Sequence, residues 1–76
     1  MKIKKTAKAD FHTANRLNGQ KATASYGVFR GEDELVGFAT KTNFGLWDAY
    51  YIETGERVLG YSCSSLKQLK EKLAAI

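Results

Sequence analysis

The chain has 76 residues, one cysteine, one histidine, no proline and a formal net charge of +4. A chain of this length forms a single domain over residues 1–76, and a lone cysteine excludes a disulfide within the chain. Its apolar runs are too short to span a membrane, and its charged start is not followed by the apolar stretch of a signal peptide, so we expect a cytoplasmic protein without membrane contact. The core of so small a domain supplies only roughly 3–5 kcal/mol of net stability, which leaves a homodimer open.

Residues 1–9 are basic and alternate only weakly, with Ile3 as the one large apolar side chain after Met1. Two interpretations stay open for them. They form an edge strand that lysine keeps soluble, or a basic arm that contacts phosphates.

Residues 10–17 also permit two structures. Asp10 can cap a short helix that ends at Asn18-Gly19 in a left-handed cap. In the alternative, residues 11–17 form a strand, and Asn18-Gly19 makes the type I′ turn of a hairpin into the next strand. The side chains in this segment are indifferent helix formers, so the sequence does not decide between the two.

Three strands are predicted in the middle of the chain. Alternating apolar residues predict strands over Ala22–Arg30 and Leu35–Lys41, joined by an acidic turn at residues 31–34. Aromatic and β-branched residues predict a further strand over Leu46–Ile52.

The C-terminal part is predicted to contain a hairpin and a helix. A turn with Gly55 leads into Arg57–Tyr61, which we expect to return as an antiparallel strand. Ser65 then begins a helix over Ser65–Ala75, with Gln68 at the capping-box position from which it can reach the Ser65 amide. The apolar stripe of this helix consists of Leu66, Leu69, Leu73 and Ile76.

These elements predict an α+β fold: a four- or five-stranded antiparallel β-meander with one C-terminal amphipathic helix, within residues 62–76, packed on one face of the sheet. The strand over residues 46–52 places Trp47 and Ala49 on one face and Tyr50 on the other. Because a single helix covers one face only, we expect some of the aromatic side chains to meet solvent, a second copy or a partner.

The charge is unevenly distributed, with +6 on residues 1–30, −4 on residues 31–61 and +2 on residues 62–76. A basic segment of this kind is typical of proteins that bind nucleic acid, so our first hypothesis is a nucleic-acid-binding accessory or regulatory factor. The predicted phosphate contacts are Lys2, Lys4, Lys5, Lys8, Arg16, Lys21 and Arg30, with Lys67, Lys70 and Lys72 of the helix as supports.

The second hypothesis is a protein-binding regulator or inhibitor. Exposed aromatic side chains of the sheet would anchor the partner, and the acidic turns would select a basic one. Adjacent acids in one turn cannot converge on a single ion, so we expect no metal there. The candidate residues are Glu32, Asp33, Glu34 and Tyr50.

Little in the sequence supports an enzyme. His12 and Cys63 lie in different segments, and spacing marks out no third catalytic group. Cys63 lies near a helix N-terminus, where a thiol pKa can be lowered, but we expect a structural cysteine. We therefore predict a non-enzymatic protein without a cofactor.

Part of the chain resembles a known DNA-binding domain. Trp47, the Gly55 turn and the helix start Ser65-Leu66-Lys67-Gln68-Leu69-Lys70 follow one another with a strand on each side of the turn. This order, over residues 35–76, is similar to that of the arm-type DNA-binding domain of tyrosine integrases from phages and conjugative elements. The resemblance implies a three-stranded antiparallel sheet packed on a C-terminal helix, with the sheet in the DNA major groove. In composition, the chain also resembles the small accessory proteins that phages and mobile elements encode.

Overall fold

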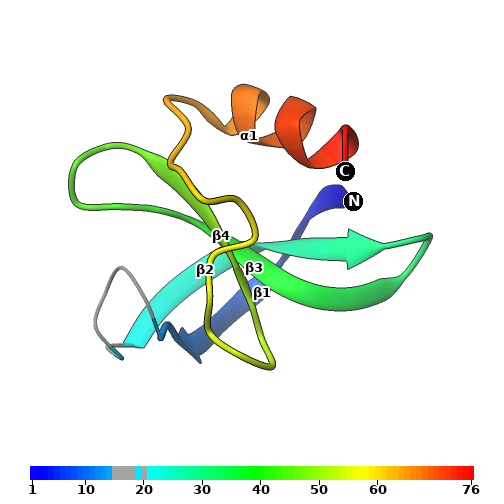
Figure 1. The fold of residues 1–76 in the computed structure, drawn as a ribbon. Coiled ribbons are helices and arrows are strands. Elements are labelled where there is room, and N and C mark those ends of the chain that lie inside the picture. The colour runs from blue at the N-terminus through cyan, green and yellow to red at the C-terminus, as the bar shows by residue number, and fades with distance from the viewer. Residues whose placement is uncertain (15–18, 20) are drawn as a thin grey trace.

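The computed structural model describes residues 1–14, 19 and 21–76, and it contains four strands followed by one helix (Figure 1). The sheet is antiparallel, with its strands in the order β1-β2-β3-β4. The predicted α+β meander with a C-terminal helix is therefore confirmed. The elements are β1 (Lys2–His12), β2 (Lys21–Arg30), β3 (Glu34–Lys41), β4 (Trp47–Tyr51) and α1 (Leu66–Ala74).

The basic N-terminal segment is an edge strand and not a free arm. β1 pairs with β2 along its length, from Lys2 opposite Phe29 to His12 opposite Lys21. The N-terminal ammonium donates a hydrogen bond to the Leu73 carbonyl at 2.9 Å, so the end of the chain is held against α1. Because β1 continues through His12, the helical interpretation is wrong for the beginning of residues 10–17. Residues 15–18, which complete that segment and include Asn18 of the predicted turn, lie outside the described part of the chain.

The strand predicted over Arg57–Tyr61 is wrong. The segment runs beside β4 but forms only one isolated bridge with it, Arg57 with Tyr50, and a second bridge, Cys63 with Trp47, follows beyond the segment. Val58 and Leu59 are neighbours in sequence, yet both pack against the core on the helix side of the sheet. A strand cannot place consecutive side chains on one face, so packing of both residues prevents a regular ladder.

The helix begins where the sequence predicts. The Ser65 hydroxyl accepts a hydrogen bond from the Gln68 amide at 3.1 Å, as an N-cap does. The Gln68 side chain accepts from the amide of Ser64 at 2.8 Å, and not from the Ser65 amide as expected. Leu69 and Leu73 of the predicted stripe are fully buried, so α1 packs on the sheet by these two residues.

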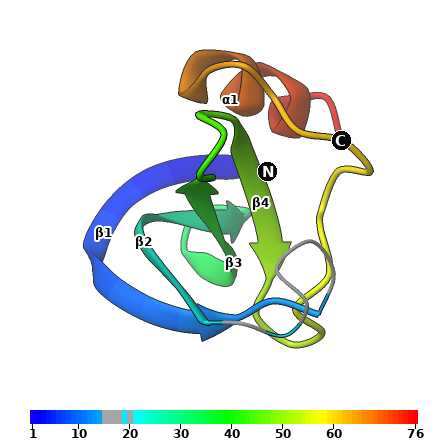
Figure 2. The ribbon, with the colours of Figure 1, turned by 90° about the vertical axis from the view of Figure 1, so that its left-hand side faces the viewer.

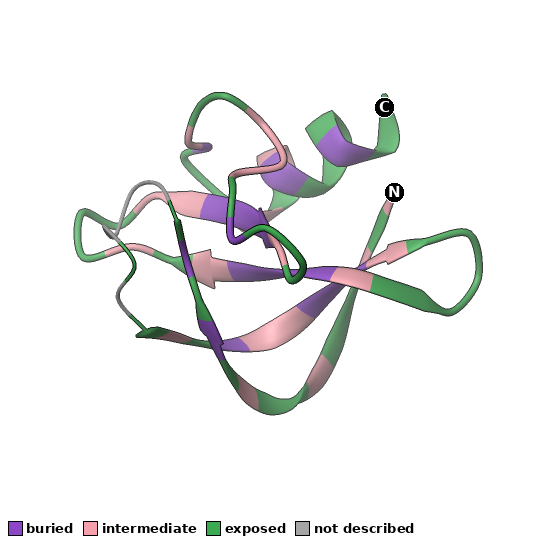
Figure 3. Ribbon diagram, turned by 60° about the horizontal axis from the view of Figure 1, so that its bottom comes forward, coloured by how far each residue is buried: buried purple, intermediate pink, exposed green. Residues whose placement is uncertain are grey.

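The core on the helix side of the sheet combines strand residues with these two leucines. Its buried members are Val28, Ala39, Ala49, Cys63, Leu69 and Leu73, which together we call the helix-side cluster. Trp47 packs against the helix-side cluster and meets the Tyr26 ring edge-on at 5.7 Å between centroids. Figure 3 shows the buried residues along the middle of the strands and on the side of α1 that faces them.

The opposite side of the sheet is covered by β1 itself. The β1–β2 register shifts between Lys5 and Ala9, and an irregularity of this kind bends a strand. Figure 2 shows β1 as a long arc whose second half passes beneath the other strands. Phe11 in this half lies 5.1 Å from the Phe38 ring and 5.8 Å from the Tyr50 ring, between centroids. Phe11, Ala24, Phe38 and Tyr50 are all buried there and form a second cluster.

Some aromatic side chains do meet solvent as expected, since Phe44 and Tyr61 are exposed, but this second cluster shows that Tyr50 is not one of them. Tyr50 is fully buried, and its hydroxyl donates to the Asp48 carboxylate at 3.2 Å. Tyr50 is therefore a core residue and is not accessible as an anchor for a partner. Among the residues that the structure describes, the exposed large apolar side chains lie at the ends of elements and in turns, and they are Leu35, Phe44, Ile52, Tyr61 and Ile76.

Candidate functional site: an acidic groove

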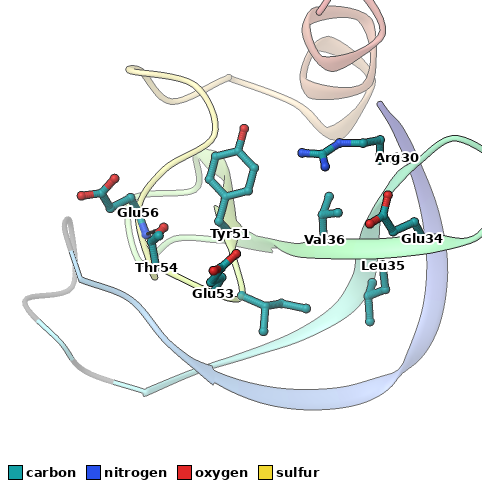
Figure 4. Close-up of a pocket in the computed structure, with 9 residues that line it drawn as sticks. Arg30, Glu34, Leu35, Val36, Tyr51, Glu53, Thr54 and Glu56 are labelled. Atoms are coloured by element: carbon teal, nitrogen blue, oxygen red, sulfur yellow. Dashed lines mark hydrogen bonds between the residues drawn. The ribbon is translucent and has the colours of Figure 1, made fainter.

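A cavity of about 550 Å³ lies where β3 begins and β4 ends. Figure 4 shows Tyr51, Val36 and Arg30 on one side of the strands and Leu35 pointing to the opposite side. The cavity therefore passes over the end of the sheet and does not lie on a single face. We call it the acidic groove, and it is lined by Arg30, Glu34, Leu35, Val36, Tyr51, Ile52, Glu53, Thr54 and Glu56.

Strand pairing brings the two walls of the acidic groove together. At the end of the β2–β3 ladder, Arg30 lies opposite Glu34. On the other wall, the Ile52 amide donates to the Val36 carbonyl at 3.0 Å, just beyond the last β3–β4 pair. The turn that follows β4 is therefore held beside the start of β3, and residues about twenty positions apart in sequence share one cavity.

The turn that carries Glu53 and Glu56 is fixed by backbone hydrogen bonds. The Tyr51 amide donates to the Glu56 carbonyl, and the Gly55 amide donates to the Tyr51 carbonyl, both at 2.9 Å. The Ala14 amide donates to the Gly55 carbonyl at 2.7 Å, which joins the turn to the end of β1. Gly55 has φ +71°, and a Cβ there would lie 2.7 Å from the Ala14 nitrogen, so only glycine fits.

The acidic groove has an excess of negative charge beside apolar surface. Three glutamates and one arginine line it, which gives a net charge of −2. Among the described residues, none of these four side chains has an ion-pair partner within 4.0 Å. Leu35 and Ile52 are 42% and 45% exposed, and the half-buried Tyr51 presents an aromatic ring. Such a surface can accept a cationic group at the carboxylates and apolar side chains beside them.

The predicted protein-binding residues are separated by the structure. Glu34 lines the acidic groove, and Asp33 is exposed in the turn before it. Glu32 turns toward β1, where its carboxylate lies 3.8 Å from Lys2 Nζ and its carbonyl accepts from Lys4 Nζ. Glu53 and Glu56 were expected in a turn but not beside Glu34. The signal for their closeness was the predicted antiparallel pairing of the two strands now seen as β3 and β4.

The predicted nucleic-acid-binding residues do not gather on one surface. Lys2 and Lys4 lie at one end of the β1–β2 ladder beside Glu32, and Lys4 Nζ also stands 5.0 Å from the Phe29 ring centroid. Lys21 lies at the other end of that ladder. Lys5 and Lys8 are exposed along β1, Arg30 lines the acidic groove, and Arg16 lies outside the described residues.

The two candidate catalytic side chains are placed apart. Cys63 is 1% exposed within the helix-side cluster, and burial, with the nearby Asp48 carboxylate, raises the pKa of its thiol while Lys72 opposes the rise. His12 is exposed at the end of β1, with Nδ1 3.2 Å from the Gly19 carbonyl oxygen. A buried thiol with a raised pKa is a poor nucleophile. Over residues 1–14, 19 and 21–76, no three His, Cys, Asp or Glu side chains are grouped to hold a metal ion.

No family model, curated protein or solved structure matches this chain. The resemblance of residues 35–76 to the arm-type domain of integrases therefore stays a prediction. In the part of the chain that the structure describes, no helix has both the length and the apolar character needed to cross a membrane.

Proposed function

We propose that this protein is a small protein-binding regulator whose acidic groove receives a segment of a partner protein that carries basic and apolar side chains. The observation that supports this proposal is the convergence of Glu34, Glu53 and Glu56 from two segments of the chain onto one cavity. Leu35 and Ile52 supply apolar contact area beside the carboxylates.

The rigidity of the acidic groove favours binding. Hydrogen bonds fix the backbone on the Glu53–Glu56 side, and the Arg30–Glu34 pair of the β2–β3 ladder fixes the other side. A preformed site loses little conformational entropy when a ligand binds. The exposed carboxylates contribute chiefly to selectivity and to the association rate, because ion pairs in water are individually weak.

A titration followed by heteronuclear NMR tests the proposal. The probe is a pentapeptide that alternates arginine with leucine, and the control peptide has glutamate in place of arginine. We expect the arginine peptide to shift the amide signals of Tyr51, Ile52 and Thr54, and the glutamate peptide to leave them unchanged. Shifts confined to other parts of the molecule would contradict the proposal.

Charge-reversal variants locate the binding site. Glu53→Lys combined with Glu56→Lys should weaken binding of the arginine peptide about tenfold, since two exposed ion pairs of roughly 0.5–1 kcal/mol each are lost. The matched control is Glu32→Lys combined with Asp33→Lys, which changes the net charge equally but outside the acidic groove. Equal weakening by both pairs would mean that the peptide responds only to overall charge, and the acidic groove would not be its site.

A further inference from the structure

A second hollow separates β2 from β3 at the end of the sheet away from the acidic groove. The two strands pair only from Tyr26 opposite Ala39 to Arg30 opposite Glu34. The part of β2 that precedes Tyr26 pairs with β1 only. The part of β3 that follows Ala39 pairs with β4 only. Two adjoining hollows, of about 250 and 220 Å³, lie between the diverging strands. We call them together the crevice, and the lining residues that matter here are Lys21, Thr23, Thr40, Lys41, Thr42 and Trp47.

The crevice is cationic, in contrast to the acidic groove. Lys21 comes from β2 and Lys41 from β3, so a positive charge is contributed by each wall. Both lysines are exposed, and neither has an ion-pair partner among the described residues. The Thr40 hydroxyl donates to the Thr23 carbonyl at 3.1 Å and joins the two walls. The Asp10 carboxylate accepts at 2.7 Å from the hydroxyl of Thr23, which lines both hollows, and Asp48 lies opposite Thr40 in the β3–β4 ladder.

Aromatic rings accompany these lysines. Trp47 lines the crevice and is half-buried. Phe44 is 80% exposed in the turn that follows Lys41. This turn is well fixed, because the Thr42 amide donates to the Leu46 carbonyl at 2.6 Å and the Gly45 amide donates to the Thr42 carbonyl at 3.0 Å. Phe44 directly follows Asn43, which lines the crevice, and unpaired bases stack on aromatic rings that accompany a positively charged groove.

We propose that the crevice binds single-stranded nucleic acid. Lys21 and Lys41 contact phosphates, while Trp47 and Phe44 offer faces or edges to unstacked bases. A duplex cannot use these rings because its bases are stacked on one another, so a single strand is the better fit. Of the lysines predicted from sequence, the site retains Lys21 and adds Lys41.

The test uses Trp47, the only tryptophan of the chain, as an internal probe. The protein is titrated with an oligothymidylate of about ten nucleotides, a length within the range that small single-strand sites cover. Quenching of the Trp47 fluorescence is followed at salt concentrations from about 50 to about 200 mM. We expect saturable quenching at low salt and an affinity that falls steeply as salt is added.

Three variants separate the crevice from general charge. Lys21→Ala combined with Lys41→Ala should weaken binding and reduce the slope of log affinity against log salt by about 1.4, since each single-strand phosphate contact contributes about 0.7. Lys67→Ala combined with Lys70→Ala removes the same charge from α1 and should leave that slope unchanged. Phe44→Ala should weaken binding at least fivefold through lost stacking.

Three results would overturn the proposal: no quenching at the lowest salt, tighter binding of a duplex of the same length, or an equal effect of the α1 variant. Thermal unfolding of each variant shows that a loss of binding does not come from a loss of fold. Glu53→Lys combined with Glu56→Lys, which disables the acidic groove, should leave oligothymidylate bound at least as tightly. The two proposals can therefore fail separately.

Discussion

Replacing Phe11 by alanine tests whether the curled half of β1 closes the core on the side away from α1. The ring is 6% exposed and contacts the rings of Phe38 and Tyr50. Truncating a buried phenylalanine to alanine costs about 3–5 kcal/mol, from lost apolar burial and from the cavity left behind. A domain of this size has a net stability of only roughly 3–5 kcal/mol, so Phe11→Ala should be largely unfolded at room temperature.

Two further substitutions make this prediction quantitative. Phe11→Leu keeps most of the buried volume and should lose less than about 1.5 kcal/mol, so it should remain folded. Phe44→Ala is the matched control because it removes the same atoms from a ring that is 80% exposed, and it should change stability by no more than about 0.5 kcal/mol. Urea unfolding followed by Trp47 fluorescence measures all three. If Phe11→Ala were as stable as Phe44→Ala, the second cluster would not be part of the core.

Two other predictions concern packing and titration. Gly37→Ala would place a Cβ 2.3 Å from the Tyr50 carbonyl oxygen and should reduce the free energy of unfolding by about 1–3 kcal/mol. Gly60→Ala meets nothing within 4 Å and should increase the free energy of unfolding by up to about 1 kcal/mol. The melting temperatures of the two variants test both predictions. Cys63 keeps its proton in the folded state because its thiol pKa is raised, whereas the unfolded thiol loses its proton above a pH of about 8.5, so stability should fall as the pH rises beyond that value. This loss of stability at high pH should be absent from Cys63→Ala. In the folded protein at neutral pH, the thiol should resist alkylation, and rapid alkylation would contradict its burial.

Three strands and the helix were predictable because each of them has a local signal, whereas β1 alternates only weakly and was left open. Alternating apolar residues identified β2 and β3, aromatic residues identified β4, and Ser65 marked the start of α1. The turn at Gly55 was also correct, since its positive φ requires glycine. These features depend on residues close together in the sequence, where steric and hydrogen-bonding preferences act directly.

Features that depend on the bending of the sheet were not predictable in this way. Burial of Tyr50 requires Phe11 to pass across the sheet, and this depends on the register shift after Lys5. No local pattern specifies such a shift, because lysines, threonine and alanine occupy the bend. The acidic groove differs in this respect, because antiparallel pairing of β3 with β4, which was predicted, already places the turn after β4 beside the start of β3.

The two proposed sites, which have opposite charge, lie at opposite ends of the same strand, β3. Glu34 at the start of β3 lines the acidic groove, and Lys41 at its end lines the crevice. Seven residue steps of about 3.3 Å separate them by roughly 23 Å. This exceeds the Debye length of about 8 Å at physiological ionic strength, so each site is screened from the charge of the other. A chain with a net charge of +4 can therefore hold an acidic site for a basic protein segment and, at the far end of the same strand, a cationic site for nucleic acid.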